Sequence, residues 1–216
     1  VGHCSYLLNF AKEFSDDPWA VESLIDDMKK IHRLGGVGVV LHIGKYVGME
    51  KDVALDNIKK SVGLVLEKTP KDVKVIFENT AGKGTEIGYR FEELAEIYNL
   101  FSKEEKERIG FCLDTCHSFA GGYDLRNKDG VKEWKNTFDS LIGWEKVVCI
   151  HFNDAKKDLA SRVDRHQDIG FGFIGNEGLK EVALVAKHTN KPLILETTTE
   201  HESYDKQIDT IKAWVK

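Results

Sequence analysis

The sequence predicts a TIM-type (β/α)8 barrel of which about six of the eight βα units are present. First, short apolar runs rich in β-branched residues alternate along the chain with stretches of helical periodicity. The runs contain no interleaved polar residues, as is typical of strands in a parallel sheet that is covered on both faces. Second, a side chain able to bind a metal ion lies at the end of every such run. Third, no glycine-rich dinucleotide-binding motif follows the first run. Strand-end groups converge at the mouth of a barrel but spread along the edge of an open sheet, so a barrel is favoured.

The elements alternate regularly along the chain. The stretch 16–35 has apolar residues three and four apart, the period of a helix with one buried face, and Gly35 and Gly36 end it. The run 37–41 follows as a buried strand. By the same reasoning, strands are expected at 1–4, 37–41, 73–77, 109–113, 147–150 and 193–195, and helices near 16–35, 53–68, 91–107, 132–142, 179–187 and 204–215.

Length and composition bound the domain organisation. A chain of 216 residues with 41% apolar and 31% charged residues is expected to fold as a single domain, 1–216. A complete barrel needs about 250 residues. Because the chain starts on a strand that already carries a candidate site residue, we expect the two missing units to precede Val1. The expected organisation is therefore a barrel that is incomplete at its amino-terminal side.

Composition also excludes some classes of function. No apolar run is long enough to span a bilayer, so no membrane partner is expected. The net charge of -5 argues against nucleic-acid binding through bulk charge, so an anionic partner must be bound locally. The four cysteines show no CxxC spacing, which predicts reduced thiols and an intracellular protein, cytoplasmic or nuclear.

The candidate site consists of nine imidazole and carboxyl groups at strand ends or in the loops just after them. From His42 to His151 the strand-end members recur roughly every 36 residues, about one βα unit. Taken singly, each could be a capped or salt-bridged polar group. Nine in phase with the strands favour two or three ions of zinc, manganese or iron, because the set exceeds what one ion can use. The nine are His3, His42, Glu78, Asp114, His117, His151, Asp164, His166 and Glu196.

Two local clusters refine this hypothesis. Asp114 and His117 lie three apart on the turn that leaves a strand. In Ser-Arg-Val-Asp-Arg-His at 161–166, the two ligands alternate with Arg162 and Arg165, whose guanidinium groups suit phosphate. The competing interpretation is that these arginines neutralise Asp158 or Asp168. Arginine beside metal ligands indicates a phosphate-containing substrate.

These motifs resemble the endonuclease IV family of zinc-dependent apurinic/apyrimidinic endonucleases (AP endonuclease family 2). The resemblance covers essentially the whole chain, with Ala160 where the family usually has glycine. It rests on HCSYLLN at 3–9, ENTAGKG at 78–84, CLDTCH at 112–117, GYDLR at 122–126, HFNDAK at 151–156, SRVDRH at 161–166 and LET at 195–197.

The resemblance implies a monomeric phosphodiesterase that cuts double-stranded DNA on the 5′ side of an abasic site, leaving a 3′-hydroxyl and a 5′-deoxyribose phosphate. It implies three zinc ions per chain, with manganese or iron possible at some sites. The catalytic residue would be Glu78, which also bridges two ions. Tyr6 and Leu7 would wedge into the duplex at the lesion, where an abasic nucleotide is the cheapest to extrude, and Arg165 would contact phosphate.

Two other functions compete with this hypothesis. A sugar isomerase or epimerase of the same superfamily uses Glu, Asp, His and Glu at strand ends around one ion, but it has no use for the other five ligands. A non-catalytic truncated remnant could bind metal or damaged DNA without turnover. Metal content and incision of abasic DNA would separate the three.

Overall fold

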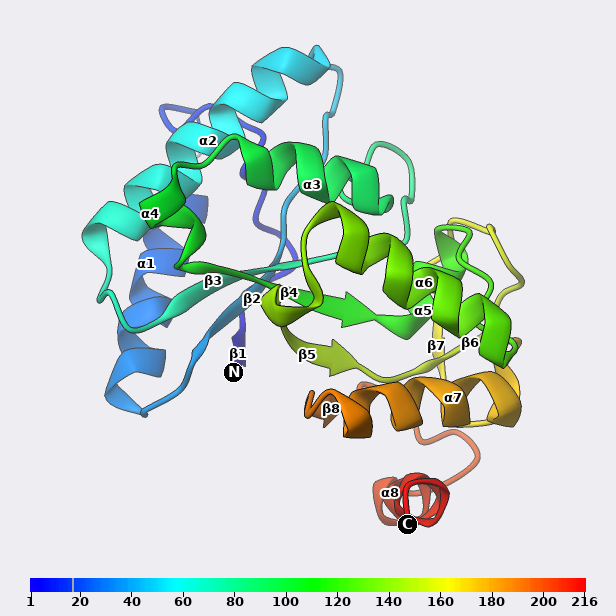
Figure 1. Ribbon diagram of the computed structural model, residues 1–216. Helices are drawn as coiled ribbons and strands as arrows, with labels where there is room; N and C mark the ends of the chain where they lie inside the picture. The colour runs from blue at the N-terminus through cyan, green and yellow to red at the C-terminus, as the bar shows by residue number, and fades with distance from the viewer. Residues whose placement is uncertain (17) are drawn as a thin grey trace. The chain divides into compact units, whose positions relative to one another are not determined.

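The computed structural model describes residues 1–16 and 18–216, which form two compact units. The first unit holds Val1–Asn79 and Thr85–Phe111, and the second holds Thr80–Gly84 and Cys112–Lys216. Figure 1 traces the chain from the blue amino-terminal strand to the red carboxy-terminal helix. In both units strands alternate with helices along the chain, which confirms the predicted βα alternation.

The sheet of the first unit has the strand order β1 (Gly2–His3), β2 (Gly38–His42), β3 (Lys74–Glu78) and β4 (Ile109–Asp114), and β4 continues into the second unit. β1 pairs with β2, and β2 with β3, in parallel. The register places His42 beside Glu78. Parallel pairing therefore puts polar groups from successive strand ends on one edge of the sheet.

Helices α1 (Pro18–Arg33) and α2 (Lys51–Lys68) pack against each other in the first unit. Leu24 and Met28 of α1 and Ile58 and Val62 of α2 are fully buried, as the helical period predicts. Leu34, which continues the apolar period in the sequence, is 80% exposed because α1 ends one residue earlier.

The helix predicted near 91–107 is interrupted. It consists of α3 (Phe91–Asn99) and α4 (Lys103–Lys106). Ser102 caps α4 by accepting a hydrogen bond from the backbone N–H of Glu105, and the Glu105 carboxylate accepts one from the backbone N–H of Ser102. This capping box starts a new helix and so ends the continuous one.

The second unit contains the end of β4, then β5 (Val147–His151) and β8 (Leu193–Ile194), which pair in parallel. Its helices are α5 (Thr115–Ala120), α6 (Lys128–Leu141), the 3-10 turn η1 (Trp144–Lys146), α7 (Gly175–His188) and α8 (Tyr204–Trp214). α6 contacts α7, and α7 contacts α8, as Figure 1 shows for the green, orange and red helices. A Cβ at Gly178 of α7 would lie 1.8 Å from the carbonyl oxygen of Leu125, so this close approach requires glycine.

Two features of the second unit are absent from the sequence prediction. The turn expected after β4 is the helix α5, and a short antiparallel pair, β6 (Asp154–Ala155) with β7 (His166–Gln167), follows β5. Both features carry or flank candidate ligands. The described part of the chain holds no helix with the length and apolar character that a bilayer crossing requires.

Candidate metal centre

The first cluster consists of His3, His42 and Glu78, which come from the ends of β1, β2 and β3. Oε2 of the fully buried Glu78 carboxylate lies 3.0 Å from Nε2 of His3 and 3.2 Å from Nε2 of His42. The two imidazole rings are in edge contact, with centroids 5.6 Å apart. The ligand atoms of all three residues lie within 4.8 Å of one another, close enough for one metal ion to bind them together.

The tautomer of His3 supports this interpretation. Its Nδ1 donates a hydrogen bond to the backbone carbonyl of Cys4 at 2.7 Å. In the neutral ring, Nε2 then carries a lone pair, and this lone pair points at Oε2 of Glu78. A backbone carbonyl on one ring nitrogen and a metal ion on the other is the usual environment of a ligating histidine.

The second cluster consists of Asp114, His117, Asp164 and His166 in the second unit. Asp114 ends β4 and caps α5, because Oδ1 accepts a hydrogen bond from the backbone N–H of His117 at 2.7 Å. Nε2 of His117 lies 3.3 Å from Oδ1 of Asp164, and Nε2 of His166 lies 3.4 Å from the same atom. The helix cap thus brings two candidate ligands to the loop that carries the other two.

Nε2 of His166 shows most directly that this cluster suits a cation. Nδ1 of His166 donates to the backbone carbonyl of Glu196 at 3.0 Å, which leaves Nε2 as the acceptor of the neutral ring. Nε2 is buried and makes no hydrogen bond within the described residues, yet it faces Oδ1 of Asp164 and, at 3.7 Å, Oδ2 of Asp114. A buried nitrogen acceptor that faces two carboxylate oxygens is unfavourable unless a cation lies among them.

The last two predicted ligands, His151 and Glu196, form a pair in the same unit. Nδ1 of the buried His151 lies 3.2 Å from Oε2 of Glu196. The structure thus brings the nine predicted ligands into two sets, three in the first unit and six in the second. Sharing of ions between the two sets stays a prediction.

Asn153 is a site residue that the sequence reasoning did not assign. Its Nδ2 donates to Oδ2 of Asp114 at 2.7 Å, and its Oδ1 accepts the backbone N–H of Glu196 at 2.8 Å. Asn153 is fully buried, and its own backbone N–H donates to the hydroxyl of Thr115. The amide therefore orients one candidate ligand, Asp114, directly and holds the segment that carries another, Glu196. Its position two residues after the candidate ligand His151 was the available signal.

A second buried residue supports the loop that follows β7. The carboxylate of Asp154 accepts hydrogen bonds from the backbone N–H groups of Ala155, Gly172 and Ile174, at 2.7, 2.9 and 2.9 Å. Burial raises the pKa of this carboxyl above its ordinary value, although these hydrogen bonds favour the ionised form. The loop after the second cluster is thereby held in one conformation.

The candidate DNA-contacting residues are exposed. Tyr6 and Leu7 are 76% and 63% exposed, so both side chains are accessible to a ligand. Arg165 is exposed and donates to the backbone carbonyl of Asp164 at 2.9 Å. Asp168, one of the two aspartates that could neutralise the arginines, instead accepts hydrogen bonds from the backbone N–H groups of Thr199, His201 and Glu202. The exposed guanidinium of Arg165 therefore keeps donors for an anion.

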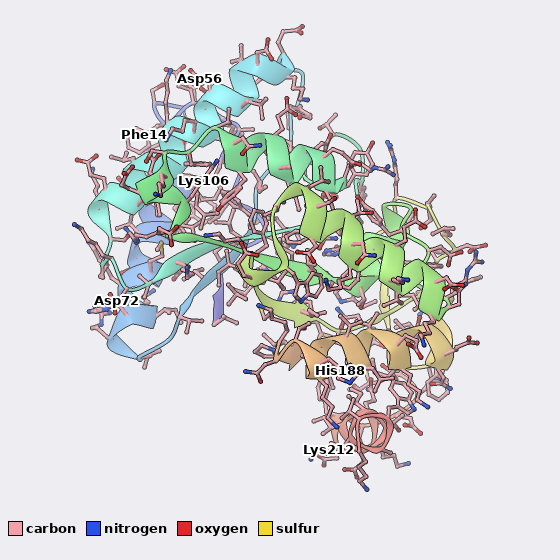
Figure 2. All side chains as sticks on the ribbon, viewed as in Figure 1. Phe14, Asp56, Asp72, Lys106, His188 and Lys212 are labelled. Atoms are coloured by element: carbon pink, nitrogen blue, oxygen red, sulfur yellow. The ribbon has the colours of Figure 1, made fainter. Side chains whose placement is uncertain are left out.

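The three histidines outside the predicted set have other surroundings. Nδ1 of His32 lies 2.9 Å from Oδ2 of Asp72, which Figure 2 labels in the segment between α2 and β3. His188, also labelled there, is an exposed residue in the last turn of α7. His201 stacks on the ring of Phe171 with centroids 4.7 Å apart. His32 and His201 thus have the contacts of structural side chains, and His188 is a surface residue.

The fold and the strand-end clusters define a class of protein. Residues 1–214 match the family model of the xylose isomerase-like TIM barrels. The chain is therefore a (β/α)8-type barrel protein, as the sequence predicts. A crystal structure of a D-tagatose 3-epimerase-like protein has a TM-score of 0.78 over 99% of this chain and 75% of its own, but at 20% identity it shows the fold alone.

More similar proteins narrow the class. A protein of Acanthamoeba polyphaga mimivirus named endonuclease 4 is 37% identical over all of this chain and 74% of its own length. A protein of Buchnera aphidicola that is also named endonuclease 4 is 38% identical over 99% of this chain and 75% of its own length. The crystal structure of endonuclease IV from Thermus thermophilus has a TM-score of 0.83 at 34% identity, covering 99% of this chain and 74% of its own. The chain belongs to the endonuclease IV family.

Proposed function

We propose that this chain is a DNA-repair endonuclease that hydrolyses the phosphodiester 5′ to an abasic site in double-stranded DNA, leaving a 3′-hydroxyl and a 5′-deoxyribose phosphate. Family membership supports a nuclease. The observation that carries the metal dependence is the buried Nε2 of His166, which faces two carboxylates without a hydrogen bond. We further propose an intracellular monomer.

The nine side chains would hold three zinc ions per chain, with manganese or iron possible at some positions. The donor set fits, because it contains imidazole and carboxylate groups. In at least His3 and His166, Nδ1 donates a hydrogen bond to a backbone carbonyl, which leaves Nε2 to bind an ion. Divalent ions in such a site lower the pKa of water and neutralise charge on phosphate oxygens.

The protein's own groups would supply position and proton transfer. The buried carboxylate of Glu78 lies between two imidazoles, where it can orient or deprotonate the attacking water. Arg165 would hold a phosphate of the duplex through its exposed guanidinium. Tyr6 and Leu7, both exposed, would occupy the gap that the missing base leaves in the stack.

The single-metal isomerase hypothesis gains no support beyond the shared fold. Its four strand-end residues would leave five further imidazole and carboxyl groups in the two clusters without a role. The non-catalytic remnant remains a distinct outcome of the test, since it predicts metal binding without incision.

The test is incision of a duplex that carries one tetrahydrofuran abasic analogue, compared with the same duplex undamaged. We expect chelator-sensitive nicking of the damaged duplex only. Glu78→Gln should lower the rate by about a thousandfold, because it removes a catalytic carboxylate. Glu93→Gln is the matched control, since Glu93 is a half-buried carboxylate of the same unit that accepts the backbone N–H of Gly88. Full activity in Glu78→Gln would refute its role, and metal binding without nicking would refute the endonuclease.

A further inference from the structure

Two buried cysteines lie next to the second unit's metal ligands. Cys112 precedes Asp114 by two residues on β4, and Cys149 precedes His151 by two residues on β5. Alternate residues of a strand share a face, so each thiol is on the same face of its strand as the ligand after it. Both thiols are buried, at 0% and 1% exposure, and neither forms a disulfide.

The thiols also lie near each other and near an imidazole. One ligand atom of each of Cys112, Cys149 and His151 lies within 4.8 Å of the other two. Metal–sulfur and metal–nitrogen bonds are about 2.3 and 2.0 Å long, so small side-chain movements would place all three atoms around one ion. This donor set differs from that of the two clusters, because it contains sulfur and lacks carboxylate.

We propose that Cys112, Cys149 and His151 form an additional site for a thiophilic divalent cation, Zn²⁺ or Cd²⁺, that shares His151 with the phosphodiesterase centre. Thiolate ligands select soft ions over Mg²⁺ and Mn²⁺. Each thiol loses its proton to solvent when the ion binds. Nδ1 of His151 faces Glu196, an arrangement in which a carboxylate orients an imidazole toward a metal ion on its other side.

Occupation of this site has a consequence for activity that rests on the proposed function. When the imidazole of His151 binds the cation together with the two sulfur atoms, it is no longer available as a ligand of the phosphodiesterase centre. Cadmium should therefore inhibit incision by a route that depends on the cysteines. The alternative role of the thiols is that of small apolar residues that fill the interior.

The site can be detected without any activity measurement. Cadmium added to the zinc-loaded protein should produce the ultraviolet charge-transfer absorbance of cadmium–thiolate bonds at one equivalent. Cys112→Ser and Cys149→Ser should each lower the cadmium affinity by about a hundredfold, because one of three protein ligands is lost. Cys4→Ser is the matched control: Cys4 is also buried, and burial raises its pKa to about 12, yet it lies in the first unit. Circular dichroism checks that each variant is folded.

Two results would overturn the proposal. One is an unchanged absorbance in folded Cys112→Ser and Cys149→Ser. The other is loss of the absorbance only in Cys116→Ser, which would place cadmium with Asp114 and His166 instead. Incision with and without cadmium, each variant normalised to its own rate, then tests the inhibition: Cys149→Ser should lose the inhibition. If the wild-type chain nicks no DNA, the proposed function fails while the absorbance still decides the metal site.

Discussion

Replacing Asn153 with alanine removes the amide that connects two strand ends of the second unit. The amide donates to the carboxylate of Asp114 at 2.7 Å and accepts the backbone N–H of Glu196 at 2.8 Å. The first bond is charge-assisted and contributes about 2 kcal/mol, and the second contributes about 1 kcal/mol. The free energy of unfolding of the metal-free protein should therefore fall by about 3 kcal/mol.

Zinc binding should weaken as well, by about 10- to 100-fold, since loss of a group that orients metal ligands typically has that effect. Urea unfolding of the chelated protein measures the first effect, and competition with a chromogenic chelator measures the second. Asn57→Ala is the control, because Asn57 is a buried amide of the first unit that donates to the carbonyl of Ala11. It should lower stability alone. Unchanged zinc affinity in Asn153→Ala would refute the assigned positioning role.

Three further predictions test other parts of the structure. Arg165→Ala should weaken binding to abasic DNA and reduce the slope of log K against log salt by about one; an unchanged slope would exclude a phosphate contact. Glu105→Gln should lower the free energy of unfolding by about 1 kcal/mol at pH 7. Burial raises the pKa of Glu105, but hydrogen bonds from Lys59 and Ser102 outweigh this and hold the pKa below its usual value. Its stabilisation is therefore complete above the unfolded-state pKa and is lost as pH falls, so wild type and variant should converge below about pH 3 in urea titrations; a constant difference would contradict this. Ala160→Gly should raise the free energy of unfolding by about 0.5 kcal/mol, because Ala160 has a φ of 59°; a less stable variant would show that the backbone strain is unimportant.

The strand ends were predictable because their signal is periodic. A buried strand and the polar residue after it recur once per βα unit, so the positions of His42, Glu78, Asp114 and His151 follow from spacing alone. The register of β2 with β3, which sets His42 beside Glu78, is a direct outcome of that periodicity.

The missed features depend on contacts between segments or on local capping. α5 is only six residues long and begins because Asp114 accepts a backbone hydrogen bond. It is too short for a periodic apolar pattern to predict it. The break between α3 and α4 follows from the Ser102 cap in a stretch whose helical pattern is otherwise continuous. The role of Asn153 requires β8 to lie beside β5, and the local sequence does not predict this pairing.

The zinc content of the purified chain, measured by elemental analysis after removal of loosely bound metal, tests the central claim most directly. Nine ligands predict about three zinc ions per chain, and His166→Ala should retain fewer. One ion per chain would match the isomerase arrangement instead. Absence of bound zinc in a folded protein would contradict the proposed metal centre altogether.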